Sequence, residues 1–306
     1  MTLALLFEQL LNGLQLGVML FLMAAGLTLV FGVMGLINLA HGSMFMAGAF
    51  VTAWVAGLTG SFWVGLLAGV LAAAAIGALV EIFVIRRLYA RDHLDQVLAT
   101  FALILIFSEG TRWVFGASPL WLDPPTLLSG SINLPGGAIY SAYRLAIIAI
   151  GLVVAVGLYL LISRTRLGMQ IRAGESDREM IGALGVDIAK LYTLVFSLGA
   201  ALAGLAGGLI GALQSVQVGM GEPVLILAFV VIVIGGIGSV KGALIASVMV
   251  GVVDTAGRIF LPTLLTTFME TSQASTIGAS VGSILIYLMM AAILAVRPQG
   301  LFPANA

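Results

Sequence analysis

The chain has 306 residues, of which 61% are hydrophobic and only 8% are charged, and its mean hydropathy is +1.19. Soluble domains average roughly 45–50% apolar and about 25% charged residues, so this composition excludes a protein whose main solvent is water. The formal net charge is zero, which argues against nucleic acid as a partner. The sequence contains no cysteine, which excludes disulfides and thiol chemistry.

Long apolar segments recur from Leu10 to Val296. A bilayer core requires about 20 apolar residues per helical span, whereas the strands of an outer-membrane barrel alternate apolar and polar residues. These segments do not alternate, so the sequence predicts an all-α fold. We expect a polytopic membrane helix bundle of about eight to ten transmembrane helices with broken or re-entrant segments. The candidate spans lie near Leu10–Phe31, Leu36–Leu58, Phe62–Ile85, Val97–Phe115, Tyr143–Ile162, Leu191–Leu213, Val224–Ile234, Gly242–Phe260 and Ile277–Val296.

The basic residues indicate how the spans are oriented. Loops rich in Lys and Arg stay on the cytoplasmic side, which predicts a bacterial inner-membrane protein with its N-terminus outside and its C-terminus in the cytoplasm. The first apolar run has neither a positive n-region nor a small-residue cleavage site, so we interpret it as a retained span. The basic residues that set this orientation are Arg86, Arg87, Arg91, Arg164, Arg166, Arg172, Arg178, Lys190, Lys241 and Arg297.

Two segments lie outside the apolar runs within a single transmembrane domain predicted over residues 1–306. The outer loop, at about residues 116–142, is rich in proline and glycine, which favour turns, and we interpret it as a lid or docking surface. The stretch at about residues 167–189 is charged and amphipathic and favours a short cytoplasmic helix.

Polar residues interrupt the apolar sequence at one place in particular, the segment Asn38 to Ser43, which includes His41 and Gly42. An unpaired polar group in lipid costs several kcal/mol unless it faces a cavity or a partner, so this segment is a candidate substrate path. In an alternative interpretation, Asn38 and His41 only cap a helix.

A second interruption, Gly235-Gly236-Ile237-Gly238 with Lys241-Gly242, resembles Gly32-Val33-Met34-Gly35 with His41-Gly42, and transporters often carry paired broken helices along the substrate path. We therefore add Gly235, Gly236 and Gly238 to the candidate path, although a chance similarity is an open alternative. Asn12 in the first span is interpreted as a group that hydrogen-bonds a neighbouring helix.

Charged residues inside the spans favour structure over chemistry. Glu109 and Arg112 lie three residues apart and Asp254 and Arg258 four apart, so each pair shares a helix face and is expected to neutralise itself. The sequence shows no catalytic constellation, no metal-ligand cluster and no P-loop. We therefore expect no enzyme activity, no cofactor and no metal in this chain.

Three segments together resemble the permeases of the branched-chain amino acid importer family, in particular the first member of the leucine-type permease pair. These segments are Gly26–Gly42, Gly235–Ala243 and Arg297–Phe302, and the resemblance covers nearly the whole chain. Ser43 stands where the family commonly has an acidic residue, which bears on the substrate rather than on the fold.

The resemblance implies a transport complex. It implies a second, related permease subunit, two cytoplasmic ATP-binding subunits and an extracytoplasmic solute-binding protein, all acting at the lipid bilayer. Substrates in the wider family include branched-chain amino acids, amides, urea and aromatic acids. The residues that resemble the family's coupling helix, which docks on the ATP-binding subunit, are Arg172, Ala173, Asp177, Gly185 and Val186.

Two other classes of transporter fit the composition. A passive channel needs only a Gly-rich, nearly uncharged pore. An ion-coupled secondary transporter usually needs an intramembrane acidic residue for its coupling ion, and Glu109 or Asp254 would serve only if unpaired.

Overall fold

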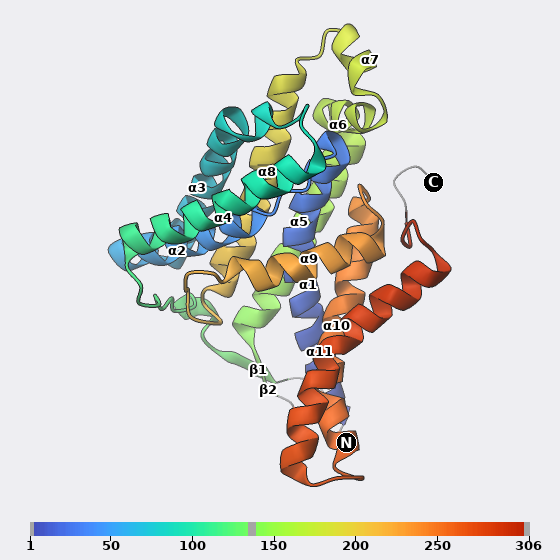
Figure 1. The fold of residues 1–306 in the computed structure, drawn as a ribbon. Helices are drawn as coiled ribbons and strands as arrows, with labels where there is room; N and C mark the ends of the chain where they lie inside the picture. Colours follow the sequence, from blue (N-terminus) through green and yellow to red (C-terminus); the bar gives the residue numbers. More distant parts are fainter. Residues whose placement is uncertain (1–2, 134–138, 303–306) are drawn as a thin grey trace. The chain divides into compact units, whose positions relative to one another are not determined.

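The computed structural model describes residues 3–133 and 139–302 of the chain. These residues form eleven α-helices, two 3-10 helices and one small hairpin (Figure 1). The elements are α1 (Leu3–Met34), α2 (His41–Thr59), α3 (Phe62–Phe83), η1 (Ile85–Arg87), α4 (His93–Phe115), η2 (Thr126–Leu128), β1 (Ser131–Asn133), β2 (Ile139–Ser141), α5 (Ala142–Arg164), α6 (Arg166–Ser176), α7 (Arg178–Ala183), α8 (Ile188–Ile210), α9 (Gly221–Gly235), α10 (Val240–Leu265) and α11 (Thr271–Val296).

The predicted polytopic helical fold is confirmed. Among the described residues, eight helices are long and apolar enough to cross a membrane. The ninth candidate span becomes α9, which has 15 residues and is therefore only about 22 Å long, less than the ~30 Å hydrocarbon core. This length fits a broken or re-entrant segment, and that assignment of α9 stays a prediction.

The described residues divide into two compact units by the contacts among their backbones, and the predicted single domain stays a prediction. Unit 1 consists of residues 1–21, 126–152 and 229–306, and unit 2 of residues 22–125 and 153–228. Three helices, α1, α5 and α9, begin in one unit and end in the other.

Unit 2 is built on the close packing of α2, α3 and α8 through small residues. A Cβ atom added at Gly48 of α2 would lie 2.6 Å from the Gly204 carbonyl oxygen of α8, and one at Gly69 of α3 would lie 2.5 Å from the Gly48 oxygen. Such contacts let the three backbones approach closely. Within a membrane the hydrophobic effect does not hold helices together, so they associate through close van der Waals packing at small residues.

Unit 1 contains the α10–α11 hairpin, the first part of α1, and the small hairpin of β1 and β2. Gly17 on α1 contacts α10 at the Ser247 carbonyl, where an added Cβ would lie 2.8 Å from the oxygen. The Asn12 side-chain oxygen accepts hydrogen bonds from Arg144 (2.8 Å) and Tyr140 (3.2 Å). Arg144 lies on α5, so the prediction that Asn12 bonds to a neighbouring helix is confirmed.

The outer loop is described in two pieces, because Pro135, Gly136 and Gly137 lie outside the described residues. Its described part holds η2 and the antiparallel pair β1–β2, in which Ile132 faces Tyr140. Earlier in the loop, Leu120 forms an antiparallel bridge with Val216. The predicted lid or docking role of this loop stays a prediction.

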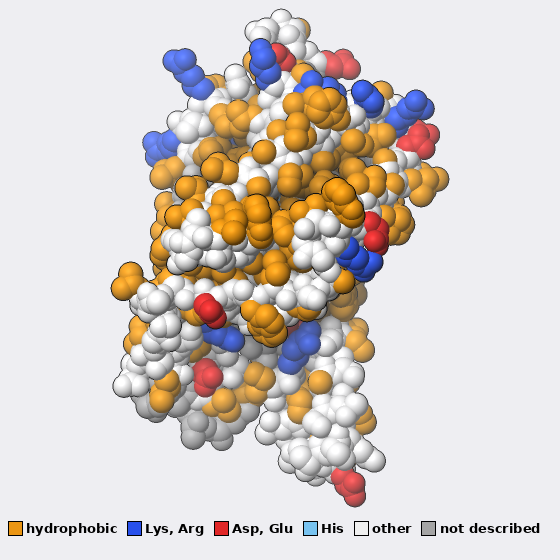
Figure 2. Space-filling model, turned by 90° about the vertical axis from the view of Figure 1, so that its left-hand side faces the viewer, with side chains coloured by type: hydrophobic (Ala, Val, Ile, Leu, Met, Phe, Trp, Pro, Cys, Tyr) orange, Lys and Arg blue, Asp and Glu red, His pale blue; other side chains and the backbone are white. Residues whose placement is uncertain are grey.

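Figure 2 shows how side chains are distributed on one face of the molecule. Hydrophobic side chains are spread over much of this face, most densely through its middle, and most of the visible Lys and Arg side chains lie in its upper part. Such exposed apolar surface is unusual for a protein in water and fits the lipid environment that the composition predicts.

Candidate translocation path and coupling segment

The break between α1 and α2 carries the first group of predicted path residues. Asn38, His41 and Ser43 are 0%, 1% and 3% exposed. Both amide atoms of Asn38, Nε2 of His41 and Oγ of Ser43 have no hydrogen-bond partner among the described residues. An unpaired buried polar group costs about 1–3 kcal/mol, so stability alone does not account for these side chains. Nor do they cap α2, because its N-cap is Ala40 and makes no side-chain capping bond.

The start of α9 lies against this break. A Cβ added at Gly42 would lie 2.9 Å from the carbonyl oxygen of Gly221, the first residue of α9. The next residue, Glu222, has a buried carboxylate oxygen, Oε2, without a partner among the described residues. Sequence analysis missed Glu222 because nothing local distinguishes it from an acidic residue in the first turn of a helix, where such residues are common.

The second group of predicted path residues forms the turn between α9 and α10. Gly236 and Gly238 have φ angles of 101° and 84°, a conformation that favours glycine. Ser239 then caps α10, because its hydroxyl accepts a hydrogen bond from the Gly242 amide (3.0 Å). This turn belongs to unit 1 and the first group to unit 2.

The predicted coupling segment has two short helices where the sequence predicted one. α6 ends and α7 begins at Asp177, whose backbone is extended (φ −155°, ψ 99°) and whose carboxylate accepts hydrogen bonds from the amides of Glu179 (3.0 Å) and Met180 (2.9 Å). The side chain therefore competes with helical continuation and caps the next helix instead. α7 ends at Ala183, and Gly185, two residues further on, has a φ of 88°.

The other predicted coupling residues lie on α6 or just after α7. The Arg172 guanidinium on α6 donates to the Ile162 carbonyl oxygen, Ala173 on α6 is half-buried, and the Val186 amide donates to the Ile181 oxygen (3.3 Å). Asp187 caps α8 by accepting from the Lys190 amide (3.1 Å), and this hydrogen bond lowers the pKa of the carboxyl group.

A groove of about 590 Å³ separates the end of α1 from α6 and α7 within unit 2. Its polar lining includes Arg91 and His93, which precede or begin α4, and three acidic residues of the coupling segment, Glu175, Asp177 and Glu179. Burial raises the pKa of the Glu175 carboxyl group. The coupling segment therefore has a polar boundary with the helical body of unit 2.

Sequence analysis assigned no special role to Glu81, but the structure makes it the centre of a network. Its side chain is 0% exposed and pairs with Arg86 (2.9 Å). The same carboxylate accepts hydrogen bonds from Tyr89 (2.8 Å) and from Thr193 on α8 (2.6 Å). Two effects raise the pKa of the Tyr89 hydroxyl: burial is the larger, and the hydrogen bond to Glu81 is the second. The network ties α3 to the first turns of α8, which directly follows the coupling segment.

The two ion pairs predicted within single helices are confirmed. Arg112 contacts Glu109 at 2.6 Å, and Arg258 contacts both carboxylate oxygens of Asp254, at 3.0 and 2.9 Å. The ion-coupled alternative needed one of these two carboxylates to be unpaired. Both are paired, so this observation does not support that alternative.

A multi-pass helical fold, a buried polar break and a separate polar segment beside it are the features of a membrane permease. The comparison with known families agrees. The chain belongs to the family described as "Branched-chain amino acid transport system / permease component", whose model matches residues 9–294. The resemblance inferred from the sequence motifs is thereby confirmed.

Individual relatives are similar over most of their length. The high-affinity branched-chain amino acid transport system permease protein BraD of Pseudomonas aeruginosa is 31% identical over 264 residues, which is 82% of this chain and 85% of BraD. The Escherichia coli permease LivH is 28% identical, covering 84% of this chain and 87% of its own. The probable permease LivH of Methanocaldococcus jannaschii is 26% identical, covering 92% and 88%. These relatives are transport permeases, in line with a role in transport.

Proposed function

We propose that this chain is the membrane-spanning subunit of an ATP-driven importer, with its N-terminus outside and its C-terminus in the cytoplasm. Its partners are a second permease, two cytoplasmic ATP-binding subunits and an extracytoplasmic solute-binding protein. The substrate is a branched-chain amino acid or a related small polar solute such as an amide, urea or an aromatic acid. Family membership supports this role, as do the names of the relatives, which specify branched-chain amino acid transport.

The observation that carries the substrate path is the group of unpartnered polar atoms at Asn38, His41 and Ser43. Unpartnered polar groups destabilise the folded state. Their presence here is explained if a polar solute hydrogen-bonds to them as it moves along the path. Glu222, whose neighbour Gly221 contacts Gly42, joins this path as an acceptor for a solute amino or amide group. Gly235, Gly236 and Gly238 have a supporting role, as the turn that leads into α10.

Replacing Asn38 tests the path. Asn38→Leu keeps the branched shape and the four heavy atoms of the side chain but replaces the unsatisfied amide with two methyl groups, so we expect the melting temperature in detergent to stay the same or to rise by a few degrees. Uptake into proteoliposomes that contain the complete complex should nevertheless fall at least tenfold. Unchanged uptake in a stable Asn38→Leu variant would show that this segment does not line the path.

The coupling function is proposed for α6 and α7, with Arg172, Ala173, Asp177, Gly185 and Val186 as the residues that shape the docking surface. ATP-driven closure of the nucleotide-binding pair would move this segment and switch the path between the two faces of the membrane. The two capping bonds of Asp177 and the left-handed Gly185 give α7 defined ends, as a docking element requires.

Gly185 and Gly182 provide a matched pair of substitutions. An alanine at φ 88° costs about 1–2 kcal/mol, which lowers the equilibrium constant for the native docking geometry roughly five- to thirty-fold. Gly185→Ala should therefore reduce uptake per ATP hydrolysed in proteoliposomes, by up to that factor. Gly182→Ala lies inside α7, where the nearest atom to an added Cβ is 3.7 Å away, and should be silent. Equal coupling in the two variants would argue against the assignment.

A further inference from the structure

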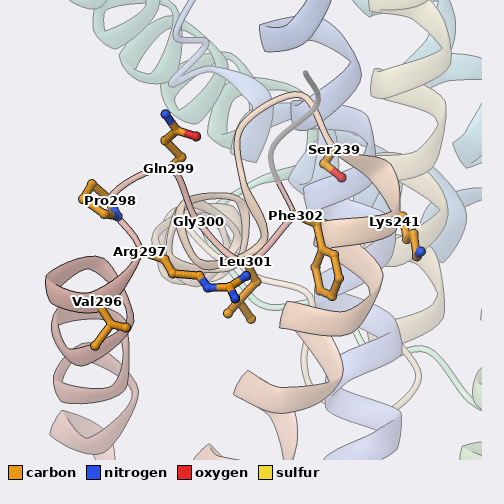
Figure 3. A pocket seen from close by; sticks show the side chains of 9 residues that line it. All are labelled: Ser239, Lys241, Val296, Arg297, Pro298, Gln299, Gly300, Leu301 and Phe302. Carbon is orange, nitrogen blue, oxygen red and sulfur yellow. The ribbon is translucent and has the colours of Figure 1, made fainter. Parts of the chain in front are cut away.

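The last described residues, Arg297–Phe302, form a C-terminal strap that turns back on the junction of α9 and α10 (Figure 3). The Leu301 amide donates to the Ile234 carbonyl oxygen (2.8 Å) and the Phe302 amide to the Gly235 oxygen (2.9 Å). The last carbonyls of a helix have no partner within the helix. The strap therefore satisfies two such groups at the end of α9, which fixes its position within unit 1.

The strap lines an open cavity of about 640 Å³. Its two charged lining residues are Lys241, in the first turn of α10, and Arg297, at the start of the strap. Figure 3 shows them on opposite sides of the Phe302 ring, and the Lys241 ammonium lies 5.6 Å from the ring centroid. The complete lining is Ser239, Lys241, Val296, Arg297, Pro298, Gln299, Gly300, Leu301 and Phe302.

The two positive charges of this cavity have no acidic partner among the described residues. None of the nine lining residues is acidic, and neither cation forms an ion pair within the described residues. The cavity also opens at the N-terminus of α10, a helix of 26 residues, whose dipole adds partial positive charge there. These features together favour an anionic ligand.

The place of the cavity indicates which anion. It lies where the candidate span of α10 begins and that of α11 ends, and the ends of two such spans are expected at a membrane boundary. Val296, in the cavity wall, is 81% exposed, and Ile237 in the preceding turn is 50% exposed. A free phosphate ion would use only the cations, whereas a phospholipid would also cover the apolar side chains.

We propose that this cavity binds the phosphate headgroup of an anionic phospholipid, with Lys241 and Arg297 as its cationic partners. Basic pockets beside membrane helices commonly bind such headgroups. The bound lipid would place negative charge between the start of α10 and the strap, and its chains would lie against Val296. The strap would then connect the end of α9 to the surrounding bilayer.

Titration of lipid onto the purified, delipidated chain in a neutral detergent tests the proposal, with native mass spectrometry as the readout. The probes are short-chain phosphatidylglycerol and phosphatidylcholine with the same acyl chains. Two cations near a membrane surface contribute enough to make the binding of phosphatidylglycerol to Lys241→Gln/Arg297→Gln roughly ten- to thirty-fold weaker. Binding of phosphatidylcholine should be unchanged.

Two further variants separate the site from general effects. Arg87→Gln/Arg164→Gln removes two exposed basic residues at the ends of other spans and should bind phosphatidylglycerol normally. Lys241→Arg/Arg297→Lys keeps both charges and should retain binding, which controls for folding of the strap. Equal losses in the two charge-removing variants would overturn the proposal, as would undiminished binding by Lys241→Gln/Arg297→Gln. Displacement of phosphatidylglycerol by equimolar inorganic phosphate would assign the cavity to a free anion instead.

Discussion

Gly48→Ala is expected to destabilise the chain by about 3 kcal/mol or more and to lower its apparent melting temperature by roughly 5–10 °C. The reason is that the new Cβ atom would meet backbone rather than a movable side chain. It would lie 2.6 Å from the Gly204 carbonyl oxygen and 2.8 Å from the Gly204 carbonyl carbon, so α2 and α8 would have to separate. Thermal unfolding in detergent, followed by size-exclusion chromatography, measures the effect.

Gly57 on the same helix is the matched control. An added Cβ there has no atom within 4 Å among the described residues, and alanine is favoured over glycine in a helix by roughly 0.5–1 kcal/mol. Gly57→Ala should therefore melt at the same temperature as the parent chain or slightly above it. If Gly48→Ala were as stable as Gly57→Ala, that result would contradict the close packing of α2 against α8 at Gly48.

Glu81→Gln is expected to cost about 2–4 kcal/mol of stability. The Glu81 side chain is 0% exposed while that of Arg86 is 38% exposed, and removing one partner of a buried pair typically costs about 3–5 kcal/mol. We place the loss of stability toward the lower end of that range because the Arg86 guanidinium, once unpaired, can still be solvated by water. The substitution also weakens the hydrogen bonds from Tyr89 and Thr193. Thermal unfolding of the purified chain measures this loss.

Glu109→Gln serves as the comparison, because the Glu109–Arg112 pair has side chains 70% and 53% exposed. Such pairs contribute about 0–1 kcal/mol, so this variant should unfold within a few degrees of the parent chain. Adding Arg86→Gln to Glu81→Gln should recover part of the lost stability, since no unpaired charge is then left. A Glu81→Gln variant that is as stable as Glu109→Gln would contradict a central role for this network.

The sequence alone determined the class of fold and much of the local structure. Apolar runs of about 20 residues have few alternatives to a membrane helix, and the spacing of Asp254 and Arg258 is sufficient to predict their pairing, because side chains four residues apart share a helix face. It also identified the polar segment around Asn38 and His41. The split of the coupling segment at Asp177 was missed, although an Asp ahead of a short helical stretch is a recognised cap signal.

Only the tertiary structure decided the contacts between residues far apart in the chain. Glu81 and Thr193 are separated by 112 positions, and nothing local to either indicates the other. The Leu301 amide of the strap donates a hydrogen bond to Ile234. This contact brings the C-terminal motif against the end of α9, although nothing in the sequence indicated that the two segments meet. The partner of a buried polar group depends on which helices pack together, and that choice is made by shape and small-residue contacts along whole helices rather than by any local pattern.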